Sequence, residues 1–175
     1  MAKLLSALLV ALWAATLGPA MHTSVGVAPA VAIAPASACR ADLWARVYHP
    51  ARLEVAAPCV RVTGVIVDAT HGRESDGVRH EADGDTHGWL QLDAPFASML
   101  DAGNVQDEGG NLVFEVICHF RASQLDAIAA CRGADGAPNP PPVGTHVAVT
   151  GVYVQDTNHG RWMEIHPVSR FEVMR

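Results

Sequence analysis

Apolar positions recur with two different periods along the chain, and the longest pattern occurs twice. The segment VRVTGVIVDATHG (60–72) is echoed by VAVTGVYVQDTNHG (147–160), and both read V-x-V-T-G-V-x-V before a polar turn that ends in His-Gly. A solenoid needs about three copies or more, so repeats of that kind are excluded. We predict two long strands in equivalent settings, each with a central glycine, Gly64 or Gly151, where a coiled strand bends or bulges.

Three further segments have the pattern of strands. THGWLQLD (86–93) alternates Leu90 and Leu92 with other side chains, which is the period of a half-buried strand. NLVFEVICHF (111–120) is almost continuously apolar and is predicted to be a central strand. RWMEIHPV (161–168) alternates again. Its predicted core face holds Met163 and Ile165, and its opposite face holds Trp162, Glu164 and His166.

One segment changes to a helical period. In SQLDAIAAC (123–131) apolar residues recur every three positions, and Ser123 followed by Asp126 forms a helix start signal. We therefore predict one short helix there. Polar or Pro/Gly-rich loops are predicted at 69–85, 94–110 and 132–144.

The predicted order is strand, strand, strand, helix, strand, strand, which is the order of an OB-fold. This all-β fold with one short helix is a five-stranded Greek-key barrel. Its first and fourth strands are neighbours, which suits the two echoed segments. An immunoglobulin-type sandwich is the alternative, but it needs about seven strands and no internal helix. We place the barrel domain at 59–175 and a lead-in at 39–58, which is expected to pack Trp44, Val47 and Tyr48 on the barrel.

The N-terminus predicts export. Residues 1–38 contain Lys3 and no acidic residue, and the apolar run 4–18 precedes a stretch that ends in Ala-Ser-Ala. This is the pattern of a secretory signal peptide, with cleavage predicted after Ala38 and a secreted, periplasmic or cell-surface location. The apolar run is shorter than the roughly 20 residues that span a bilayer, which argues against a retained anchor. Lipidation of Cys39 is a further alternative, although the position three before it is not the usual leucine.

The cysteines agree with export. All four follow the predicted cleavage site, and an even count in an exported chain indicates disulfides. We prefer the pairs Cys118–Cys131 and Cys39–Cys59, because each closes a short loop around one predicted strand. Zinc binding by these cysteines is the alternative, but the chain has no Cys-x-x-Cys spacing.

The charge balance limits the partner. Removal of residues 1–38 leaves 11 arginines against 18 acidic residues, a formal charge of −7. A negative domain repels a phosphate backbone, and nucleic-acid binding draws mainly on cationic contacts. The expected ligand is therefore a small molecule, a glycan or a protein.

Several motifs resemble those of a group of uncharacterised exported bacterial proteins with OB-type barrels. The resemblance extends from Tyr48 to Val168. Its most specific motif is HGRWMEIHPV (159–168), and EADGDTH (81–87) is a shorter motif that matches by chance more often. YHPARLEV, PCVRVTG and the DAGN of 101–104 also contribute. The group has no established activity, so the resemblance implies the fold and no chemistry.

Two polar loops are predicted to meet. In an OB barrel the loops after the first and fourth strands lie at one side of the binding face, and here these are 69–85 and 156–160. Imidazole with carboxylates suits zinc, and a carboxylate-rich set suits calcium. The chain has neither a complete EF-hand loop nor His-Glu-x-x-His, so a structural or solvent-facing role is the alternative. The candidate ligands are Asp83, Asp85, His87, Asp156, His159, Glu164 and His166.

Two functions remain open for this site. One is binding without catalysis, with Trp89 and Trp162 as stacking surfaces beside His87 and Arg161. For both tryptophans, packing under the long loops is the alternative. The other function is metal-dependent hydrolysis of phosphodiesters, because the secreted thermonuclease family also has an OB-type barrel. That family's motifs are absent and no nucleophile is evident, so we favour the binding module over an enzyme.

Overall fold

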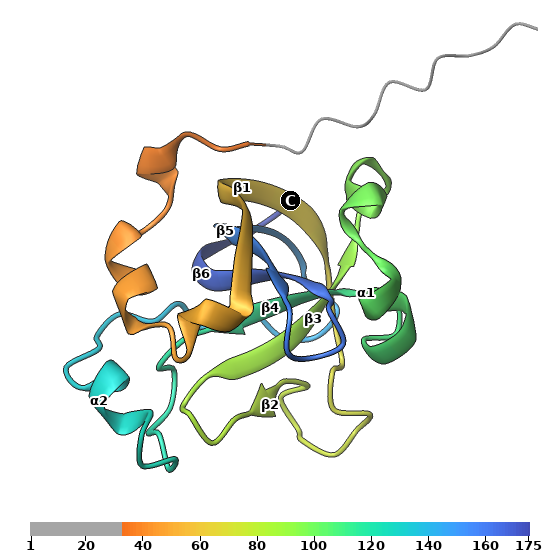
Figure 1. The fold of residues 1–175 in the computed structure, drawn as a ribbon. Coiled ribbons are helices and arrows are strands. Elements are labelled where there is room, and N and C mark those ends of the chain that lie inside the picture. Colours follow the sequence, from red (N-terminus) through yellow and green to blue (C-terminus); the bar gives the residue numbers. More distant parts are fainter. Residues whose placement is uncertain (1–32) are drawn as a thin grey trace, which may run out of the picture.

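The computed structural model describes residues 33–175, which form a closed five-stranded β-barrel with one extra strand (Figure 1). The strands are β1 (Leu53–Val67), β2 (Arg79–His80), β3 (Thr86–Leu92), β4 (Leu112–Val116), β5 (His146–Asp156) and β6 (Met163–Val173). Their hydrogen-bonded order is β1-β5-β6-β4-β3-β2, and pairing of β1 with β3 closes the barrel. Only β4 and β6 run parallel. The predicted OB-like barrel is confirmed, with β2 added at the edge of β3.

The two echoed segments lie side by side, as predicted. β1 and β5 are antiparallel neighbours, with Val62 opposite Val149. The expected bulge occurs at Gly151, where the pairing of β5 with β6 shifts register. Gly64 has a different role, because β1 pairs there with both β5 and β3. A Cβ atom on Gly64 would collide with the backbone carbonyl of Gln91, so this position requires glycine.

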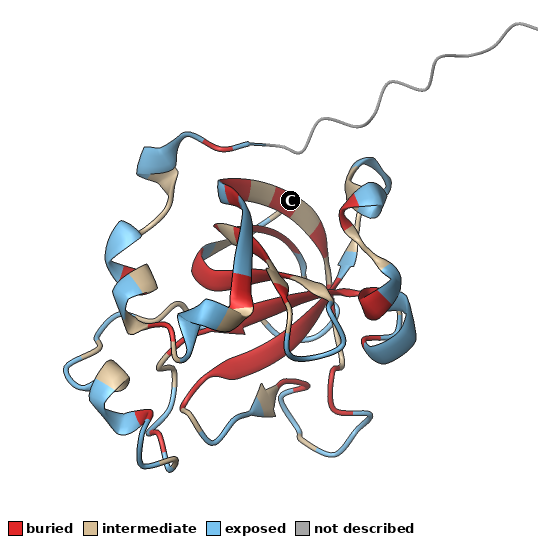
Figure 2. Cartoon of the chain, viewed as in Figure 1, coloured by how far each residue is buried: buried red, intermediate tan, exposed pale blue. Residues whose placement is uncertain are grey.

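The barrel interior is filled by the alternate apolar positions of the strands. Ile165 and Leu90 are fully buried in this core, and Met163 packs against it. The strands β3 and β4 are buried along almost their whole length (Figure 2). Burial of both faces means that a second layer covers the outside of this part of the barrel.

The N-terminal segment supplies part of that second layer. The 3₁₀ helices η2 (Ala41–Arg46) and η3 (Pro50–Arg52) precede β1. As predicted for the lead-in, Val47 is buried and Trp44 is partly buried against the apolar cluster on the outer face of the barrel. Tyr48 instead forms a hydrogen bond with Asp126. The first barrel strand, β1, begins at Leu53 and so includes the last six residues of the predicted lead-in, 53–58.

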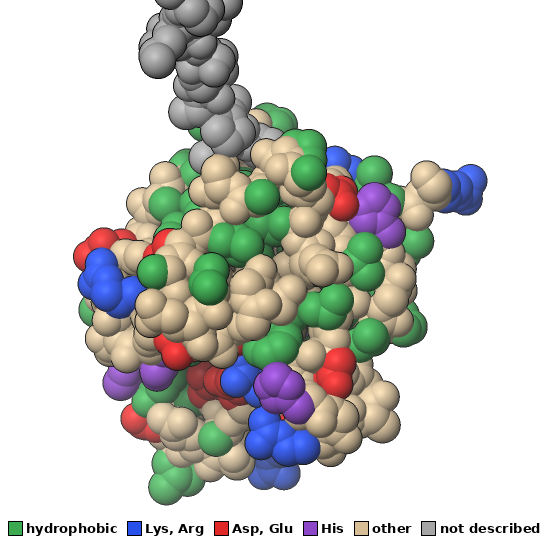
Figure 3. All heavy atoms as spheres, turned by 90° about the vertical axis from the view of Figure 1, so that its right-hand side faces the viewer, with side chains coloured by type: hydrophobic (Ala, Val, Ile, Leu, Met, Phe, Trp, Pro, Cys, Tyr) green, Lys and Arg blue, Asp and Glu red, His purple; other side chains and the backbone are tan. Residues whose placement is uncertain are grey.

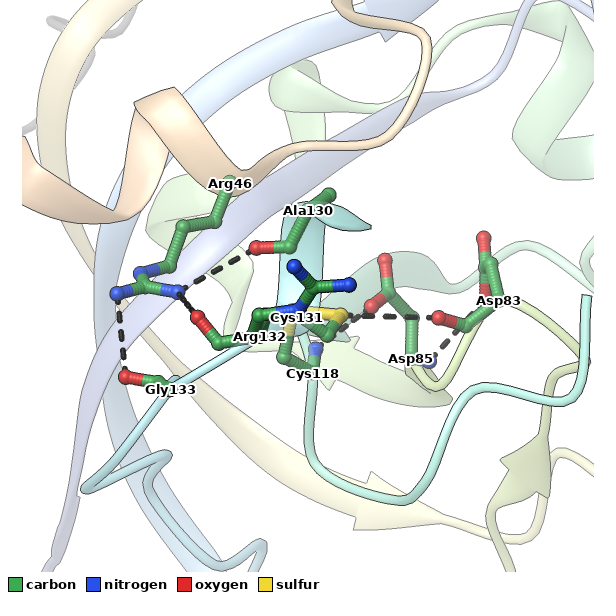
Figure 4. Close-up of a disulfide and its surroundings, with 8 residues drawn as sticks. All are labelled: Arg46, Asp83, Asp85, Cys118, Ala130, Cys131, Arg132 and Gly133. Carbon is green, nitrogen blue, oxygen red and sulfur yellow. Dashed lines mark hydrogen bonds between the residues drawn. A yellow bond between two sulfur atoms is a disulfide. The ribbon is translucent and has the colours of Figure 1, made fainter. Parts of the chain in front are cut away.

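Both preferred disulfides are confirmed. Cys39 is bonded to Cys59, and Cys118 to Cys131, which Figure 4 shows in close-up. Most of the predicted signal peptide lies outside the described residues, while Ile33 forms an isolated bridge with Val60 of β1. Within residues 33–175, no helix is long and apolar enough to cross a membrane.

The helices differ from the prediction in their number and in where the predicted helix begins. The predicted helix is shorter, since α2 spans Ile128–Cys131 and the Ser123 hydroxyl donates to the Ala82 carbonyl instead of capping it. A second helix, α1 (Ala102–Asp107), was not predicted. It begins with a capping box formed by Asp101 and Asn104. Shorter 3₁₀ turns are η1 (Ala36–Ala38) and η4 (Ala94–Met99).

Candidate functional site

Three ionisable side chains lie side by side on the outer face of the barrel: His87 on β3, Glu115 on β4 and His166 on β6. The register of β3 and β4 places His87 opposite Glu115. Glu115 Oε1 lies 3.3 Å from His87 Nδ1, and Glu115 Oε2 lies 2.8 Å from His166 Nδ1. One carboxylate therefore joins two imidazoles, and we call this set the His–Glu–His row.

Packing on both sides leaves the row almost wholly buried. The exposed fractions of His87, Glu115 and His166 are 2%, 4% and 0%. Arg52, which ends η3, covers the row and contacts Asp156, and its guanidinium lies 3.8 Å from Glu115 Oε2. Buried charges are tolerated only when they are paired, so Arg52 is required where these carboxylates meet.

Glu108 holds His87 from the opposite side. It follows α1 directly, and its Oε2 lies 3.1 Å from His87 Nε2 and 3.0 Å from Arg79 Nη2. The same oxygen accepts a hydrogen bond from the Trp89 indole N–H, and Arg79 also contacts His87 Nε2. Both ring nitrogens of His87 are therefore held, and the ring orientation is fixed.

Neighbouring charges outweigh burial in setting the protonation of the row. Burial alone would lower the pKa of His87, but hydrogen bonds to Glu108 and Glu115 raise that pKa to about 9. Burial also opposes the charge on His166, yet Glu115 raises the pKa of His166 well above its ordinary value. Burial would raise the pKa of Glu115, and His166 followed by His87 lowers it instead. In the absence of another cation, the row is an ionised carboxylate between two imidazolium rings at neutral pH.

Two more carboxylates extend the row. Asp85 lies just before β3, and its Oδ1 accepts the Cys118 backbone N–H at 2.7 Å (Figure 4). Burial raises the pKa of Asp85 to about 7. Glu164 Oε1 lies 3.1 Å from His166 Nδ1, and its Oε2 accepts the Trp162 indole N–H at 2.9 Å. Among the described residues, Asp85 Oδ2 and His166 Nε2 are buried with no hydrogen-bond partner.

The row forms part of the floor of a cleft of about 480 Å³. The two polar loops both line this cleft, as predicted from the barrel topology. Figure 3 shows acidic side chains recessed low on one face of the molecule, with arginine and histidine side chains beside them. The lining residues are Tyr48, His49, Arg52, Arg79, Glu81, Ala82, Asp83, His87, Glu115, Gln124, Asn158, His159 and Trp162.

The cleft brings together only part of the predicted site. The predicted residues that line it are Asp83, His87, His159 and Trp162. Asp156 is buried beneath it, where it contacts Arg52 and lies 3.0 Å from His159 Nδ1. Glu164 and His166 are fully buried and Asp85 is almost so, and none of the three lines the cleft.

Two residues predicted to bind ligand lie elsewhere. Trp89 is only 7% exposed and packs against Ala69 and Val113 under the long loop, so its ring face is not open to a ligand. Arg161 bonds to Gln155 Oε1 at 2.8 Å and is not part of the cleft lining.

Two groups at the row have the composition of metal ligands. In each, one potential ligand atom from every member lies within 4.8 Å of the others. The first is Glu81, His87 and Glu115, all of which line the cleft. The second is Asp85, Glu115 and His166, of which Glu115 lines the cleft and the other two do not. A third group, Glu74 and Asp76 on the loop after β1 with His80 of β2, is more exposed.

Sequence reasoning missed Glu115, Glu108 and Arg52. Glu115 is the one charged residue between Asn111 and Cys118, inside an otherwise apolar run. The hydrophobic pattern assigns this position to a buried strand, and a buried charge must be paired. This signal could have identified Glu115. Arg52 and Glu108 gave no such signal, because they lie at the ends of the short helices η3 and α1, outside the apolar runs of the sequence.

Comparison with known proteins adds no relative: no family model, no curated protein and no solved structure matches this chain.

Proposed function

We propose that this protein is an exported ligand-binding module whose cleft takes a small polyhydroxylated ligand of the saccharide class. The observation that carries the proposal is the lining of the cleft, which combines arginines and carboxylates with the aromatic rings of Tyr48 and Trp162. Both loops expected from the barrel topology contribute to it. Two disulfides support export, because such bonds persist in oxidising compartments.

The chemistry of the lining favours hydroxyl groups over a charged ligand. Arg52 and Arg79 donate hydrogen bonds, while Glu81, Asp83 and Glu115 accept them. A hydroxyl does both, so it matches this mixture, whereas a strongly anionic or cationic ligand meets like charges. An aromatic ring at the wall offers an apolar face to the C–H face of a sugar. The cleft volume lies within the range of roughly 300–1,000 Å³ that is typical of small-ligand sites.

Calorimetric titration against neutral saccharides, peptides and oligonucleotides tests the proposal. We expect saturable binding of a saccharide, and a loss of affinity of about tenfold in Trp162→Ala, since an aromatic contact contributes about 0.5–1.5 kcal/mol. Phe120→Ala is the matched control, because Phe120 is a 40% exposed aromatic residue outside the cleft. Binding of oligonucleotides in preference to saccharides, or equal losses in both variants, would overturn the proposal.

A second candidate function is metal-dependent hydrolysis in the same cleft. The observation that favours it is the group Glu81, His87 and Glu115, which faces the cleft with two carboxylates and one imidazole. A cation there would activate water. Hydrolysis of a phosphodiester that requires Mn²⁺ or Zn²⁺ and is lost in Glu81→Gln would establish this function, and no turnover with any of these ions would exclude it.

A further inference from the structure

The strongest unexplained feature is the buried group of Asp85, Glu115 and His166. These residues come from the start of β3, from β4 and from β6, so they join three strands of the barrel. Their exposed fractions are 2%, 4% and 0%, and one potential ligand atom of each lies within 4.8 Å of the other two. Glu115 also lines the cleft, whereas Asp85 and His166 do not, so the group extends from the cleft floor into the protein.

The hydrogen-bond donors and acceptors of this group do not match, and among residues 33–175 His166 Nε2 is also buried without a partner. Glu115 Oε2 and Glu164 Oε1 lie 2.8 and 3.1 Å from the same nitrogen, His166 Nδ1, which carries at most one hydrogen. Asp85 Oδ2 is buried in the same group and has no hydrogen-bond partner among residues 33–175. Buried polar atoms nearly always have partners, so this oxygen calls for a ligand.

The other oxygen of each carboxylate is held by a donor. Asp85 Oδ1 accepts from the Cys118 backbone N–H at 2.7 Å, which Figure 4 shows beside the disulfide. Glu115 Oε1 lies 3.3 Å from His87 Nδ1. Glu164 Oε2 accepts from the Trp162 indole N–H. Carboxylates that bind metals are held in this way, with one oxygen oriented by an outer partner and the other free to coordinate.

We propose that Asp85, Glu115 and His166 bind a divalent transition-metal cation, with Glu164 as a further oxygen within reach. A cation bound by one oxygen each of Asp85 and Glu115 and by one ring nitrogen of His166 would have all three residues as ligands. The imidazole then gives up one proton, as metal binding requires. One nitrogen with carboxylate oxygens suits Zn²⁺ or Mn²⁺, whereas Ca²⁺ takes six or more oxygen ligands.

The burial of the group determines how the cation enters and what it does. Since the three side chains are sealed from solvent, the cation is taken up as the chain folds. It ties β3, β4 and β6 together beside the Cys118–Cys131 disulfide, which makes it structural. This role differs from that of the cleft-facing group of Glu81 and His87, and the two share only Glu115.

The test is refolding of the exported chain, with its disulfides intact, from guanidinium with EDTA into buffer with Zn²⁺, Mn²⁺ or Ca²⁺. After desalting, metal per chain is measured by mass spectrometry and stability by thermal unfolding. We expect one tightly held Zn²⁺ or Mn²⁺ per chain and a raised Tm, with no retention of Ca²⁺. A chain that refolds free of metal, with a Tm that ignores all three ions, overturns the proposal and leaves a proton-linked polar cluster.

Two variants and one spectrum locate the cation. Asp85→Asn keeps the acceptor for the Cys118 N–H and replaces the free oxygen by an amide, so it should lose the metal. Asp76→Asn, in the exposed group with Glu74 and His80, should retain it. The opposite pattern overturns the assignment. If Asp85→Asn does not fold, X-ray absorption of the wild-type zinc form decides: one imidazole with oxygen neighbours supports the site, and sulfur neighbours or the absence of imidazole contradict it.

Discussion

Glu115 Oε2 lies 2.8 Å from His166 Nδ1, and both side chains are sealed between the barrel and the N-terminal segment. This contact forms because the parallel strands β4 and β6 pair with each other. The two residues are distant in sequence, so local structure alone could not bring them together. The other oxygen of Glu115 serves His87. The charge on Glu115 is therefore central to the stability of this face.

Removal of that charge should be costly. In the chain without a bound cation, Glu115→Gln leaves two imidazolium rings and Arg52 without their shared anion, and loss of one partner of a buried ion pair costs about 3–5 kcal/mol. We expect a decrease of at least about 3 kcal/mol in the free energy of unfolding, measured by chemical denaturation. Glu172→Gln is the control, because the partly exposed pair of Glu172 with Arg61 contributes about 1 kcal/mol or less. Equal small effects in the two variants would show that the ion pairs of Glu115 do not stabilise the fold.

The Cys118–Cys131 disulfide should stabilise the chain and also position Asp85. It closes a loop with a sequence separation of 13, for which chain entropy gives about 3 kcal/mol. The double variant Cys118→Ser with Cys131→Ser should lose that amount in denaturation. Cys39–Cys59, with a separation of 20, serves as the comparison and should cost a similar amount. A variant as stable as the wild type would contradict a stabilising role for the bridge.

The stability that Asp93 contributes where strands of the barrel meet should depend on pH. Its carboxylate accepts a hydrogen bond from Thr63 and lies 2.9 Å from His146 Nε2, which links the ends of β1, β3 and β5. The hydrogen bond from Thr63, followed by that from His146, lowers the pKa of Asp93. Because this pKa is lower in the folded chain than in the unfolded chain, the contribution to stability is present above the unfolded value and is lost as the pH falls.

Carboxyl NMR measures this effect directly. The titration midpoint of Asp93 should lie below its ordinary value of 3.8. Asp93→Asn should flatten the acid limb of the stability curve, since the variant has no carboxyl to protonate. A midpoint at or above 3.8 would show that the Thr63 and His146 contacts do not persist in solution.

The barrel could be predicted because its pattern is local and repeated. Two long β-branched segments with the same glycine identified β1 and β5 as equivalent strands, and the fold order made them neighbours. Gly64 and Gly151 were recognised as special positions. At Gly64 the reason for glycine differs from the predicted bulge, because β1 pairs there with two strands. Crowding between strands cannot be read from the pattern of one segment.

The site was predicted in part, and its omissions have one physical cause. Alternation in β3 and β6 indicates which side chains leave the core, but it does not distinguish a solvated face from a face covered by a second layer. His166 and Glu164 were assigned correctly to the face opposite the core, yet they are fully buried there. The covering residues Arg52 and Glu108 come from short 3₁₀ and α-helical segments, which are too short to show a hydrophobic period.

Binding of a ligand in the cleft is the central claim, and the indole N–H resonances test it most directly. The described chain has three tryptophans, and only Trp162 lines the cleft, whereas Trp44 and Trp89 pack elsewhere. On addition of a saccharide ligand to ¹⁵N-labelled protein, the account predicts a saturable shift of the Trp162 signal with little change in the other two. Shifts confined to Trp44 or Trp89, or three signals that stay fixed throughout the saccharide panel, would contradict it.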